Sequence, residues 1–297
     1  RGWQVSVLEQ SGLLWDGERA IALARNLRLE EGFVETLDPD HACTQWFLCG
    51  EEETHALGEI DVVMMRKDPP FDMDYIYSTY LLERGQSEGA LVINDPRSLR
   101  DCNEKFFATG FANYQPPSLV SCREDLLLAF HRDQGDVIFK KLDGMGGMSI
   151  FRASKNDSNV RVIVETLTDN GRRQIMAQRY IPEIANGDKR ILLIDGEPLP
   201  YALARVPASG ETRGNLAAGG TGIGQPLSLR DKEIANALGP ELRARGLTFV
   251  GIDVIGDYLT EVNVTCPTCV RELDAIFGLD IASMLLDAIE QKLPAAS

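Results

Sequence analysis

The stretch that most limits the possible fold is residues 136–153, DVIFKKLDGMGGMSIFRA, in which two strand-like runs enclose three glycines within four positions. A P-loop places its lysine after the last glycine, whereas Lys140 precedes the glycines here. A dinucleotide-binding fingerprint opens a helix, but the residues after Gly147 favour a strand. The stretch therefore predicts a β-hairpin with a glycine-rich tip. Its bare amides can cover a polyphosphate next to Lys140, although an ordinary glycine-rich hairpin stays open as the alternative.

The first hundred residues alternate strand-like and helical patterns. WQVSVLE, EIDVVMMR and ALVIND are typical of strands, and YIYSTYLLERGQSEG carries apolar residues at helical spacing. Such β-α-β alternation predicts a parallel sheet flanked by helices, with ligands beyond the carboxyl ends of the strands. Arg66 and Lys67 lie at such an end, where Pro69 and Pro70 stiffen the chain. This loop either presents cations to a ligand or is a solvated turn.

A second region begins near residue 102 and mixes strands and helices without this regular alternation. NDPRSLRDCNEKFFAT predicts a turn followed by a capped helix that contains Lys105. RQIMAQRYIPEI predicts a strand stopped by Pro182, and DKRILLIDGEPLPYALARV predicts a hairpin that turns at Asp195-Gly196. We place domain boundaries near residues 102 and 186, which divides the chain into 1–102, 103–185 and 186–297.

Residues 251–269, GIDVIGDYLTEVNVTCPTC, predict two short strands around a turn. Glu261 and Asn263 are two residues apart and so share one face of a strand. Their oxygens are ligands that Mg²⁺ accepts, and Asp253 on the partner strand can add another. A two-residue turn pairs position 253 with 260 and sends Asp253 to the opposite face, so a metal site requires a longer turn or a bulge. A solvated polar strand is the alternative; we favour the metal site because the neighbouring positions are strongly apolar.

The motif CPTC at the end of this stretch has the spacing of a zinc or redox site. No second cysteine pair accompanies it, and the three histidines are far away in sequence. A redox pair is expected at the start of a helix near a β-α-β unit. We expect instead that Cys266 and Cys269 are buried or pocket-lining thiols.

Residues 205–224, RVPASGETRGNLAAGGTGIG, are rich in glycine and alanine and suit neither helix nor strand. Such a stretch is either a linker or an active-site lid. A linker needs no arginine, so Arg213 in the middle, with Arg190 and Arg205 nearby, favours the lid.

Composition limits the possible partners. The formal net charge of −15 argues against sequence-independent binding of nucleic acid, which requires clustered lysines and arginines. No apolar stretch approaches the roughly 20 residues that span a bilayer, so we expect no membrane partner. Six cysteines scattered over 297 residues do not resemble a disulfide framework, and we expect reduced thiols in the cytoplasm. The chain opens at Arg1 in what reads as a strand, so we expect the natural N-terminus to lie upstream.

Six stretches together, MRKDPPFD, SLRDCNEK, LDGMGGMSIF, DGEP, GETRGNLAAGG and TEVNVTCPTC, resemble bacterial glutathione synthetase, a family of ATP-grasp ligases. The resemblance runs from about residue 60 to the C-terminus, and the family's first strand and helix are expected to be missing. It implies α/β and α+β architecture, an ATP-grasp fold in which an N-terminal parallel-sheet domain precedes two α+β domains that clasp ATP. It also implies a cytoplasmic homotetramer that joins γ-glutamylcysteine to glycine, giving glutathione, ADP and phosphate, with Mg²⁺ or Mn²⁺ as the metal.

The resemblance further implies roles for individual residues: lysines hold the phosphates, glycines cover them, residues 178–181 line the adenine pocket and Asp188 serves the nucleotide end of the site. The implied ATP-binding residues are Lys105, Lys140, Gly144, Gly146, Gly147, Gln178, Arg179, Tyr180, Ile181 and Asp188. The implied Mg²⁺ ligands are Asp253, Glu261 and Asn263. The implied contacts to substrate and to the transferring phosphate are Arg66, Arg190, Arg205, Arg213, Asn263 and Cys266.

The implied reaction passes through an acyl phosphate, which water would destroy. The residues around Arg213 are therefore expected to form a closing lid that is mobile without ligand. Where the family has Lys-Pro and Ser-Pro, this chain has Lys140-Lys141 and Cys266-Pro267, which can add charge near the phosphates and alter one hydrogen bond to the dipeptide. Two rival functions remain, an ATP-grasp ligase with another carboxylate donor and a nucleotide-binding protein without turnover.

Overall fold

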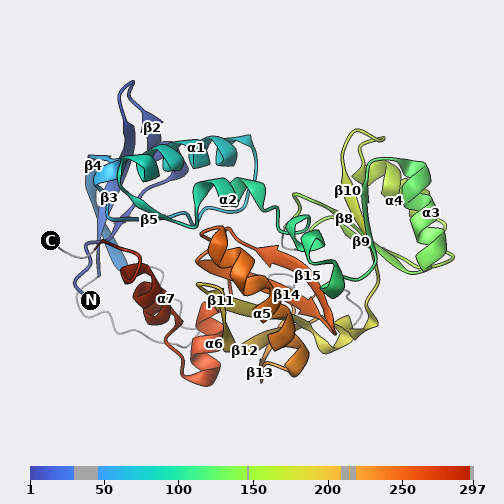
Figure 1. Cartoon of the computed structure of the whole chain (residues 1–297). Coiled ribbons are helices and arrows are strands. Elements are labelled where there is room, and N and C mark those ends of the chain that lie inside the picture. The colour runs from blue at the N-terminus through green and yellow to red at the C-terminus, as the bar shows by residue number, and fades with distance from the viewer. Residues whose placement is uncertain (30–45, 146, 209–213, 215–218, 295–297) are drawn as a thin grey trace.

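The structure is a computed structural model in which residues 1–29, 46–145, 147–208, 214 and 219–294 are described. These residues form an N-terminal region, a central lobe and a C-terminal region (Figure 1). None of the helices among them is long and apolar enough to cross a membrane.

The N-terminal region combines an antiparallel sheet with a parallel strand pair and two helices. Its elements are β1 (Ser6–Val7), β2 (Leu13–Trp15), β3 (Ala20–Leu29), β4 (Phe47–Ala56), β5 (Val62–Met64), α1 (Met73–Glu88), β6 (Leu91–Ile93) and α2 (Pro96–Asp101). Strands β5 and β6 pair in parallel with α1 between them in the chain, which confirms the β-α-β pattern for this part. Strands β1, β2 and β4 all pair with β3 in antiparallel fashion, an arrangement that the sequence pattern did not predict. The strand expected at WQVSVLE is confined to β1.

The two helices begin at side-chain caps and end where the sequence turns. Asp72 accepts a hydrogen bond from the Tyr75 amide at 2.9 Å at the start of α1, and Asp95 caps α2 in the same way. The prediction that Lys105 lies in a helix is wrong, because α2 ends at Asp101. The side chain of Asn103 accepts hydrogen bonds from the amides of Lys105 and Phe106, and this local turn replaces a further helical turn.

The central lobe is a four-stranded antiparallel sheet with two helices and a core of its own. Its elements are β7 (Ser118–Ser121), α3 (Glu124–Gln134), β8 (Val137–Lys141), β9 (Ile150–Ala153), α4 (Val160–Leu167) and β10 (Ile175–Arg179). The strand order is β7-β10-β8-β9, and the hairpin β8–β9 confirms the predicted hairpin with a glycine-rich tip. Buried apolar side chains such as Phe139, Leu127 and Val164 form a cluster that belongs to this lobe alone.

The C-terminal region is a five-stranded antiparallel sheet with three helices. Its elements are β11 (Asp188–Ile194), β12 (Glu197–Val206), β13 (Thr221–Pro226), α5 (Leu229–Ala244), β14 (Phe249–Ile255), β15 (Tyr258–Asn263), α6 (Val270–Phe277) and α7 (Ile281–Glu290). The strand order is β13-β12-β11-β14-β15. Asp195 and Gly196 both have positive φ, 49° and 78°, which confirms the predicted tight turn between β11 and β12.

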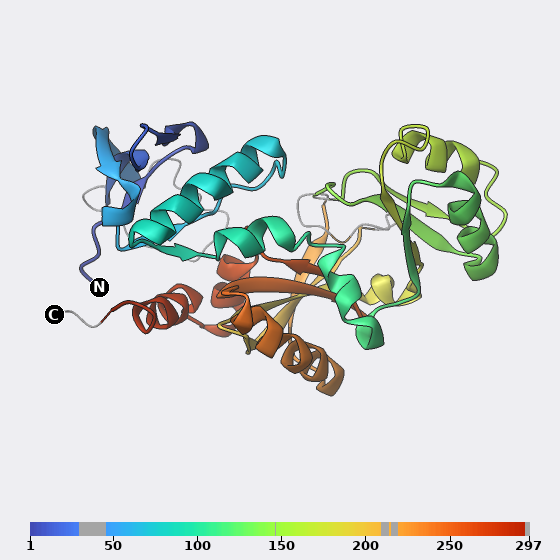
Figure 2. The same cartoon turned by 45° about the horizontal axis from the view of Figure 1, so that its top comes forward.

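The N-terminal and C-terminal regions share one apolar core, whereas the central lobe stands apart. A single buried cluster contains Leu57 and Leu82 of the first region together with Val250 and Leu238 of the last. Figure 2 shows the central lobe joined to the rest at one side of the five-stranded sheet. Residues that bridge the lobe and this sheet therefore occupy the junction between separately packed units.

Candidate active site

One face of the five-stranded sheet gathers the charged residues that the sequence singled out. Antiparallel partners in register point to the same face, as do residues two apart on one strand. Three such pairs are Asp188 with Arg205, Arg190 with Asp253, and Asp253 with Glu261. These side chains therefore share one face across β12, β11, β14 and β15. The intervening residues, for example Ile191, Ile252 and Val262, are fully buried in the core on the other face.

Asp253 stands opposite Glu261 because the hairpin β14–β15 contains a bulge. The turn pairs Val254 with Leu259, and Thr260 is then an extra residue before Glu261. The Thr260 hydroxyl donates to the Asp253 carbonyl at 3.1 Å. The bulge that the metal-site hypothesis requires is therefore present, and it brings both carboxylates to one face.

Lys105 lies along β15 because the chain before it pairs with that strand. The Val262 amide donates to the Glu104 carbonyl at 2.8 Å. The ammonium of Lys105 then lies 3.6 Å from Glu261 Oε1, is paired with the Glu104 carboxylate, and donates to the Gly144 carbonyl at 2.7 Å. Lys105 thus ties the glycine-rich tip to the five-stranded sheet.

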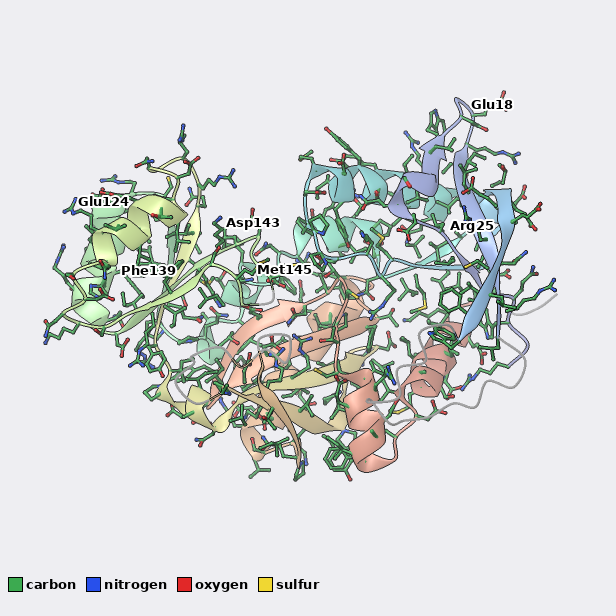
Figure 3. The ribbon with its side chains drawn as sticks, turned by 180° about the vertical axis from the view of Figure 1, so that it is seen from behind. Glu18, Arg25, Glu124, Phe139, Asp143 and Met145 are labelled. Carbon is green, nitrogen blue, oxygen red and sulfur yellow. The ribbon has the colours of Figure 1, made fainter. Side chains whose placement is uncertain are left out.

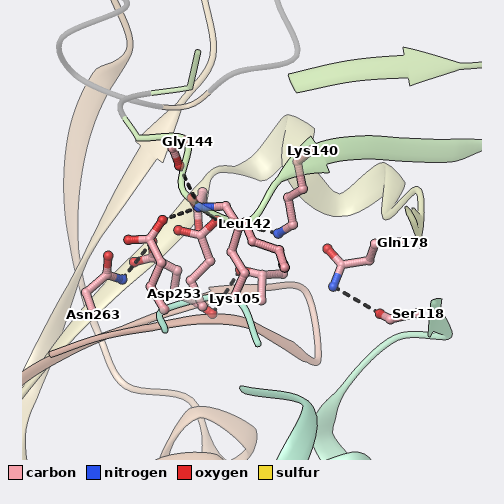
Figure 4. A network of polar contacts seen from close by, with 12 residues as sticks. Lys105, Ser118, Lys140, Leu142, Gly144, Gln178, Asp253 and Asn263 are labelled. Atoms are coloured by element: carbon pink, nitrogen blue, oxygen red, sulfur yellow. Dashed lines mark hydrogen bonds and ion pairs between the residues drawn. The ribbon is translucent and has the colours of Figure 1, made fainter. Parts of the chain in front are cut away.

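Lys140 reaches the same carboxylate from the central lobe. Figure 4 shows its side chain extending from β8. Its ammonium lies 3.4 Å from Glu261 Oε1. Lys140 pairs with Met176 on β10, so Gln178, two residues further, lies on the same face of the central sheet. The Gln178 amide is buried and donates to the Ser118 hydroxyl at 3.3 Å.

Burial makes the two lysines electrostatically different. Lys140 is 4% exposed, and burial lowers its pKa even though Glu261 opposes this shift. Burial also lowers the pKa of Lys105, but attraction to Glu261 and Glu104 outweighs it and the pKa is raised. Lys140 is therefore the cation whose charge the ligand-free protein supports least.

The two glutamates also titrate differently. Burial, reinforced by Glu261, raises the pKa of Glu104 to about 7. Burial acts the same way on Glu261, but Lys105 and Lys140 outweigh it and lower the pKa. Glu261 is therefore the firmly ionised carboxylate between the two lysines.

Two buried arginines hold Asp253. Arg190 donates from Nε to Oδ1 at 2.6 Å and from a terminal nitrogen to Oδ2 at 3.1 Å, and an Arg205 nitrogen lies 3.0 Å from Oδ2. Burial raises the pKa of Asp253, but both arginines outweigh it and hold the pKa far below its usual value. Arg205 also donates to Asp188 at 2.6 Å, and burial nevertheless raises the pKa of Asp188 to about 6. Asp188 thus belongs to the arginine cluster on the sheet face.

The other residues of the implied adenine pocket follow β10 toward the C-terminal region. Arg179, the last residue of β10, donates to the Tyr258 hydroxyl at 2.8 Å, so this segment contacts the start of β15. The Arg152 guanidinium lies 3.7 Å from the centre of the Tyr180 ring, and Ile181 is buried.

The residues implied to contact the dipeptide lie at the other end of β15. Arg66 donates to the Pro267 carbonyl at 3.1 Å, which joins the loop after β5 to the chain after β15. Cys266 is half-buried and Cys269 is buried, and both are free thiols. The structure thus brings Arg66 and Cys266 into the same neighbourhood, although they are 200 positions apart in the sequence.

Part of the expected site falls outside the described residues. Gly146 and Arg213 are not among the described residues. Of the three glycines expected to cover the phosphates, only Gly144 and Gly147 are described. The expectation that residues 205–224 suit neither helix nor strand is wrong at both ends, because β12 runs to Val206 and β13 begins at Thr221 and pairs with it.

Sequence reasoning missed Glu104 as a member of the site. Its carboxylate pairs with Lys105, its neighbour in the chain. Its negative charge also acts to raise the pKa of Lys140. The only signal is its place beside Lys105 in the stretch NEK. That stretch does not show which way the carboxylate points.

The donor set on the sheet face suits Mg²⁺. Within the described ranges, no three His, Cys, Asp or Glu side chains form a cluster that could hold a metal. The protein instead offers the carboxylates of Asp253 and Glu261 and the amide of Asn263, whose nitrogen is 3.3 Å from Asp253 Oδ2. Magnesium usually takes one or two carboxylates and completes its octahedron with phosphate oxygens and water. The residues present fit this pattern.

The fold is that of ATP-grasp ligases. The structure of the D-cycloserine synthetase DcsG superposes with a TM-score of 0.63 at 15% identity, over 81% of this chain and 86% of that one. A RiPP-associated ATP-grasp ligase from Chryseobacterium gregarium superposes with a TM-score of 0.60 at 15% identity, over 98% of this chain and 86% of that one. At this identity the likeness shows the fold alone. The fold therefore defines the class, that of ATP-grasp proteins.

The sequence identifies the family within this class. Residues 1–100 match the N-terminal domain of prokaryotic glutathione synthetase, and residues 104–278 match its ATP-grasp domain. The glutathione synthetase of Pseudomonas aeruginosa is 56% identical over 99% of this chain and 90% of that protein. The glutathione synthetase of Vibrio cholerae is 51% identical over 100% of this chain and 90% of that protein. The chain belongs to the prokaryotic glutathione synthetase family, which confirms the resemblance seen in the sequence.

Proposed function

We propose that this protein joins γ-glutamylcysteine to glycine in an ATP-dependent reaction that gives glutathione, ADP and phosphate. Membership of the family supports the choice of substrates. The observation that carries the chemistry is the meeting of Lys105 and Lys140 at Glu261, next to the glycine-rich tip.

The nucleotide is proposed to lie between the central sheet and the five-stranded sheet. The two lysines face the phosphates, the amides of Gly144, Gly146 and Gly147 cover them, and Gln178 to Ile181 line the adenine pocket. Asp188 is proposed to serve the nucleotide end through its pairing with Arg205. The burial of Lys140 supports this assignment, because a buried ammonium gains from a second anion.

The metal is proposed to be Mg²⁺, with Mn²⁺ able to replace it. Asp253, Glu261 and Asn263 would hold it together with the nucleotide phosphates. When bound, the ion offsets negative charge on the transferring phosphate. Before it binds, the two carboxylates are neutralised by Arg190, Arg205 and the lysines.

The arginines are proposed to act on the substrate side. Arg190, Arg205 and Arg213 stabilise the transferring phosphate, and Arg66, Arg190, Asn263 and Cys266 contact the dipeptide. Arg66 is exposed and anchored by one hydrogen bond to Pro267, which leaves further donors of its guanidinium for a carboxylate.

The chain's own residues supply positioning and electrostatics for the two steps. A carboxylate of γ-glutamylcysteine attacks the γ-phosphorus and ADP leaves; the amine of glycine then attacks the acyl carbon and phosphate leaves. The cations held on the sheet face stabilise the charge that develops in each step without having to reorganise. We propose that residues around Arg213 close over the acyl phosphate and exclude water.

Three further assignments are proposals of the same kind. The chain divides into 1–102, 103–185 and 186–297, and the separate core of the central lobe supports the middle unit. The protein is a homotetramer in the cytoplasm. Sedimentation velocity of the purified protein tests the tetramer.

The reaction is tested by measuring phosphate release from MgATP with γ-glutamylcysteine, glycine, both or neither. Release that requires both substrates, yields glutathione and disappears in Lys140→Ala supports the assignment. Phosphate release that occurs only when another carboxylate replaces γ-glutamylcysteine would indicate an ATP-grasp ligase with a different substrate. Binding of ATP without release under any of these conditions would indicate a nucleotide-binding protein.

A further inference from the structure

A cavity of about 20 Å³ lies between the loop after β5, the segment before Lys105 and the glycine-rich tip. Figure 3 shows Asp143 and Met145 of this tip at the edge of the central lobe that faces the other regions. Other residues that line it are Asp68, Asn103, Glu104 and Thr265. A volume of this size holds one water-sized group.

The charged residues that line this cavity are all acidic, and the rest of its lining is Asn103, Thr265 and the apolar residues Phe71, Cys102, Leu142, Met145 and Val264. Asp68, Glu104 and Asp143 contribute carboxyl groups, and no Lys, Arg or His is among the described residues that line it. Lys105 is the nearby cation, and its ammonium is already engaged by Glu104, Glu261 and Gly144. The cavity therefore favours a cation, whereas the adjoining lysine site favours an anion.

One carboxylate oxygen of Asp68, a residue that lines the cavity, has no hydrogen-bond donor among the described residues. The Thr265 hydroxyl donates to Oδ2 and fixes the carboxyl group. Oδ1 is buried and has no hydrogen-bond partner within the described part of the chain, and the same holds for the fully buried Tyr75 hydroxyl. Asp68 and Tyr75 are close enough for the carboxylate to raise the pKa of the phenol, in addition to the larger effect of burial. A buried polar atom without a partner marks the place of a missing ligand or water.

We propose that this cavity binds the ammonium group of the acceptor amino acid, with Asp68 as its ligand and as the acceptor of its proton. The inference rests on the proposed function. An ammonium is a compact cation with three donors, which suits the size of the cavity and its carboxylates. Val264 and Thr265, which line the cavity, directly follow Asn263 of the proposed metal set. The amine is thus held beside the place where the acyl phosphate forms.

In the proposed step, Asp68 takes one of the two protons that the amino group loses. The ammonium gives one proton to the carboxylate of Asp68, and the freed electron pair of nitrogen forms a bond to the acyl carbon. The bond between that carbon and the phosphate oxygen breaks, and phosphate leaves with the electron pair. The second proton of nitrogen passes to the phosphate, and Asp68 returns its proton to solvent. Burial raises the pKa of Asp68, which suits a group that must accept a proton.

The test compares glycine with hydroxylamine as acceptor in Asp68→Asn. Hydroxylamine is largely uncharged at neutral pH and traps an acyl phosphate as a hydroxamate, so it needs neither an ammonium site nor a base. We expect the variant to form γ-glutamylcysteine hydroxamate at nearly the parent rate and to raise the KM for glycine about tenfold to hundredfold, with a fall in kcat. Asp133→Asn, an exposed aspartate on α3, serves as the matched control and should change neither reaction.

Asp68→Asn that uses glycine as well as the parent overturns the inference, and so does a folded variant that has lost hydroxamate formation too, because Asp68 then acts in the first step. Should thermal unfolding show that this variant does not fold, Thr265→Val removes only the hydroxyl that fixes the carboxyl group. That variant must show the same selective loss with glycine, or the inference fails. A parent protein that forms no hydroxamate refutes the proposed function instead.

Discussion

Replacing Lys140 by methionine is expected to weaken ATP binding strongly without destabilising the ligand-free protein. The ammonium is 4% exposed, and its pKa is lowered because burial outweighs the attraction of Glu261. A lysine whose folded-state pKa is depressed reduces stability at neutral pH, since its charged form is disfavoured by folding. Methionine keeps the length of the side chain and removes the charge.

The structure gives the size of the opposing contributions. At 3.4 Å and an effective dielectric constant of about 20, Lys140 and Glu261 attract by about 5 kcal/mol. Removing an ammonium from water costs several kcal/mol, and Lys105 repels it. Because these contributions nearly cancel, Lys140→Met should change the free energy of unfolding by less than about 1 kcal/mol. Loss of a charge-assisted hydrogen bond to phosphate should instead weaken ATP binding by about 1.5–3 kcal/mol, or about 10-fold to 150-fold.

Thermal unfolding with and without MgATP separates the two effects. The parent should be stabilised by the nucleotide, while Lys140→Met should unfold like the ligand-free parent and gain little from MgATP. Lys141→Met is the matched control, because Lys141 follows on the same strand and points to the opposite face, away from the proposed phosphate site to which it was expected to add charge. A Lys140→Met protein that is more than about 2 kcal/mol less stable than the parent, yet fully protected by MgATP, would refute the reasoning.

Three further perturbations follow from buried groups. Asp253→Asn should lower the free energy of unfolding by about 3–5 kcal/mol at pH 7, because it breaks a buried ion pair. Since folding lowers the pKa of Asp253, this difference in stability should persist at pH values above 3.8, the usual pKa, and shrink as the pH falls below it. Equal urea midpoints of variant and parent at pH 7 would contradict this. Burial raises the pKa of Cys102 from 9.0 to about 11, so the stability that the neutral thiol contributes should be fully present below pH 9.0. The free energy of unfolding should then fall by at most about 2–3 kcal/mol as the pH rises to 11. Urea unfolding of Cys102→Ala should lack this pH-dependent fall, and an identical pH profile for variant and parent would contradict it. Gly196→Ala should lower the free energy of unfolding by more than about 2 kcal/mol in urea, because its Cβ would lie 2.5 Å from the Gly239 carbonyl oxygen at a φ of +78°; unchanged stability would contradict this turn geometry.

Local turn chemistry explains which parts of the fold were predictable. The turn at Asp195-Gly196 and the hairpin around the glycines are specified by residues adjacent in the chain. Strand β4 gives no such signal, because FLCGEEETHA lacks the alternation of a half-buried strand and is exposed over most of its length. The helix expected at Lys105 failed for a local reason as well, since Asn103 offers the following amides a side-chain acceptor in place of a helical turn.

The site was predictable where strand period alone decides the geometry. Glu261 and Asn263 share a face because they are two residues apart, and the parity of the turn made the bulge a condition for Asp253 to join them. Lys140 and Glu261 are 121 positions apart in the sequence, and no pattern in either stretch predicts that they pair. Such contacts depend on how the central lobe docks, which local pattern does not determine.

The ionisable side chains of the site pair with one another. The paired groups are Lys105, Lys140, Arg190 and Arg205 on one side and Glu104, Asp188, Asp253 and Glu261 on the other. In a chain of net charge −15, this pairing keeps the cations in place without making the pocket strongly positive. If phosphate binds these cations as proposed, it exchanges partners with the carboxylates instead of meeting free cations. A metal that engages Asp253 and Glu261 releases the arginines and lysines for that exchange, so metal and nucleotide should bind with positive coupling. Lys140, the least stabilised cation, is the first that we expect to change partner.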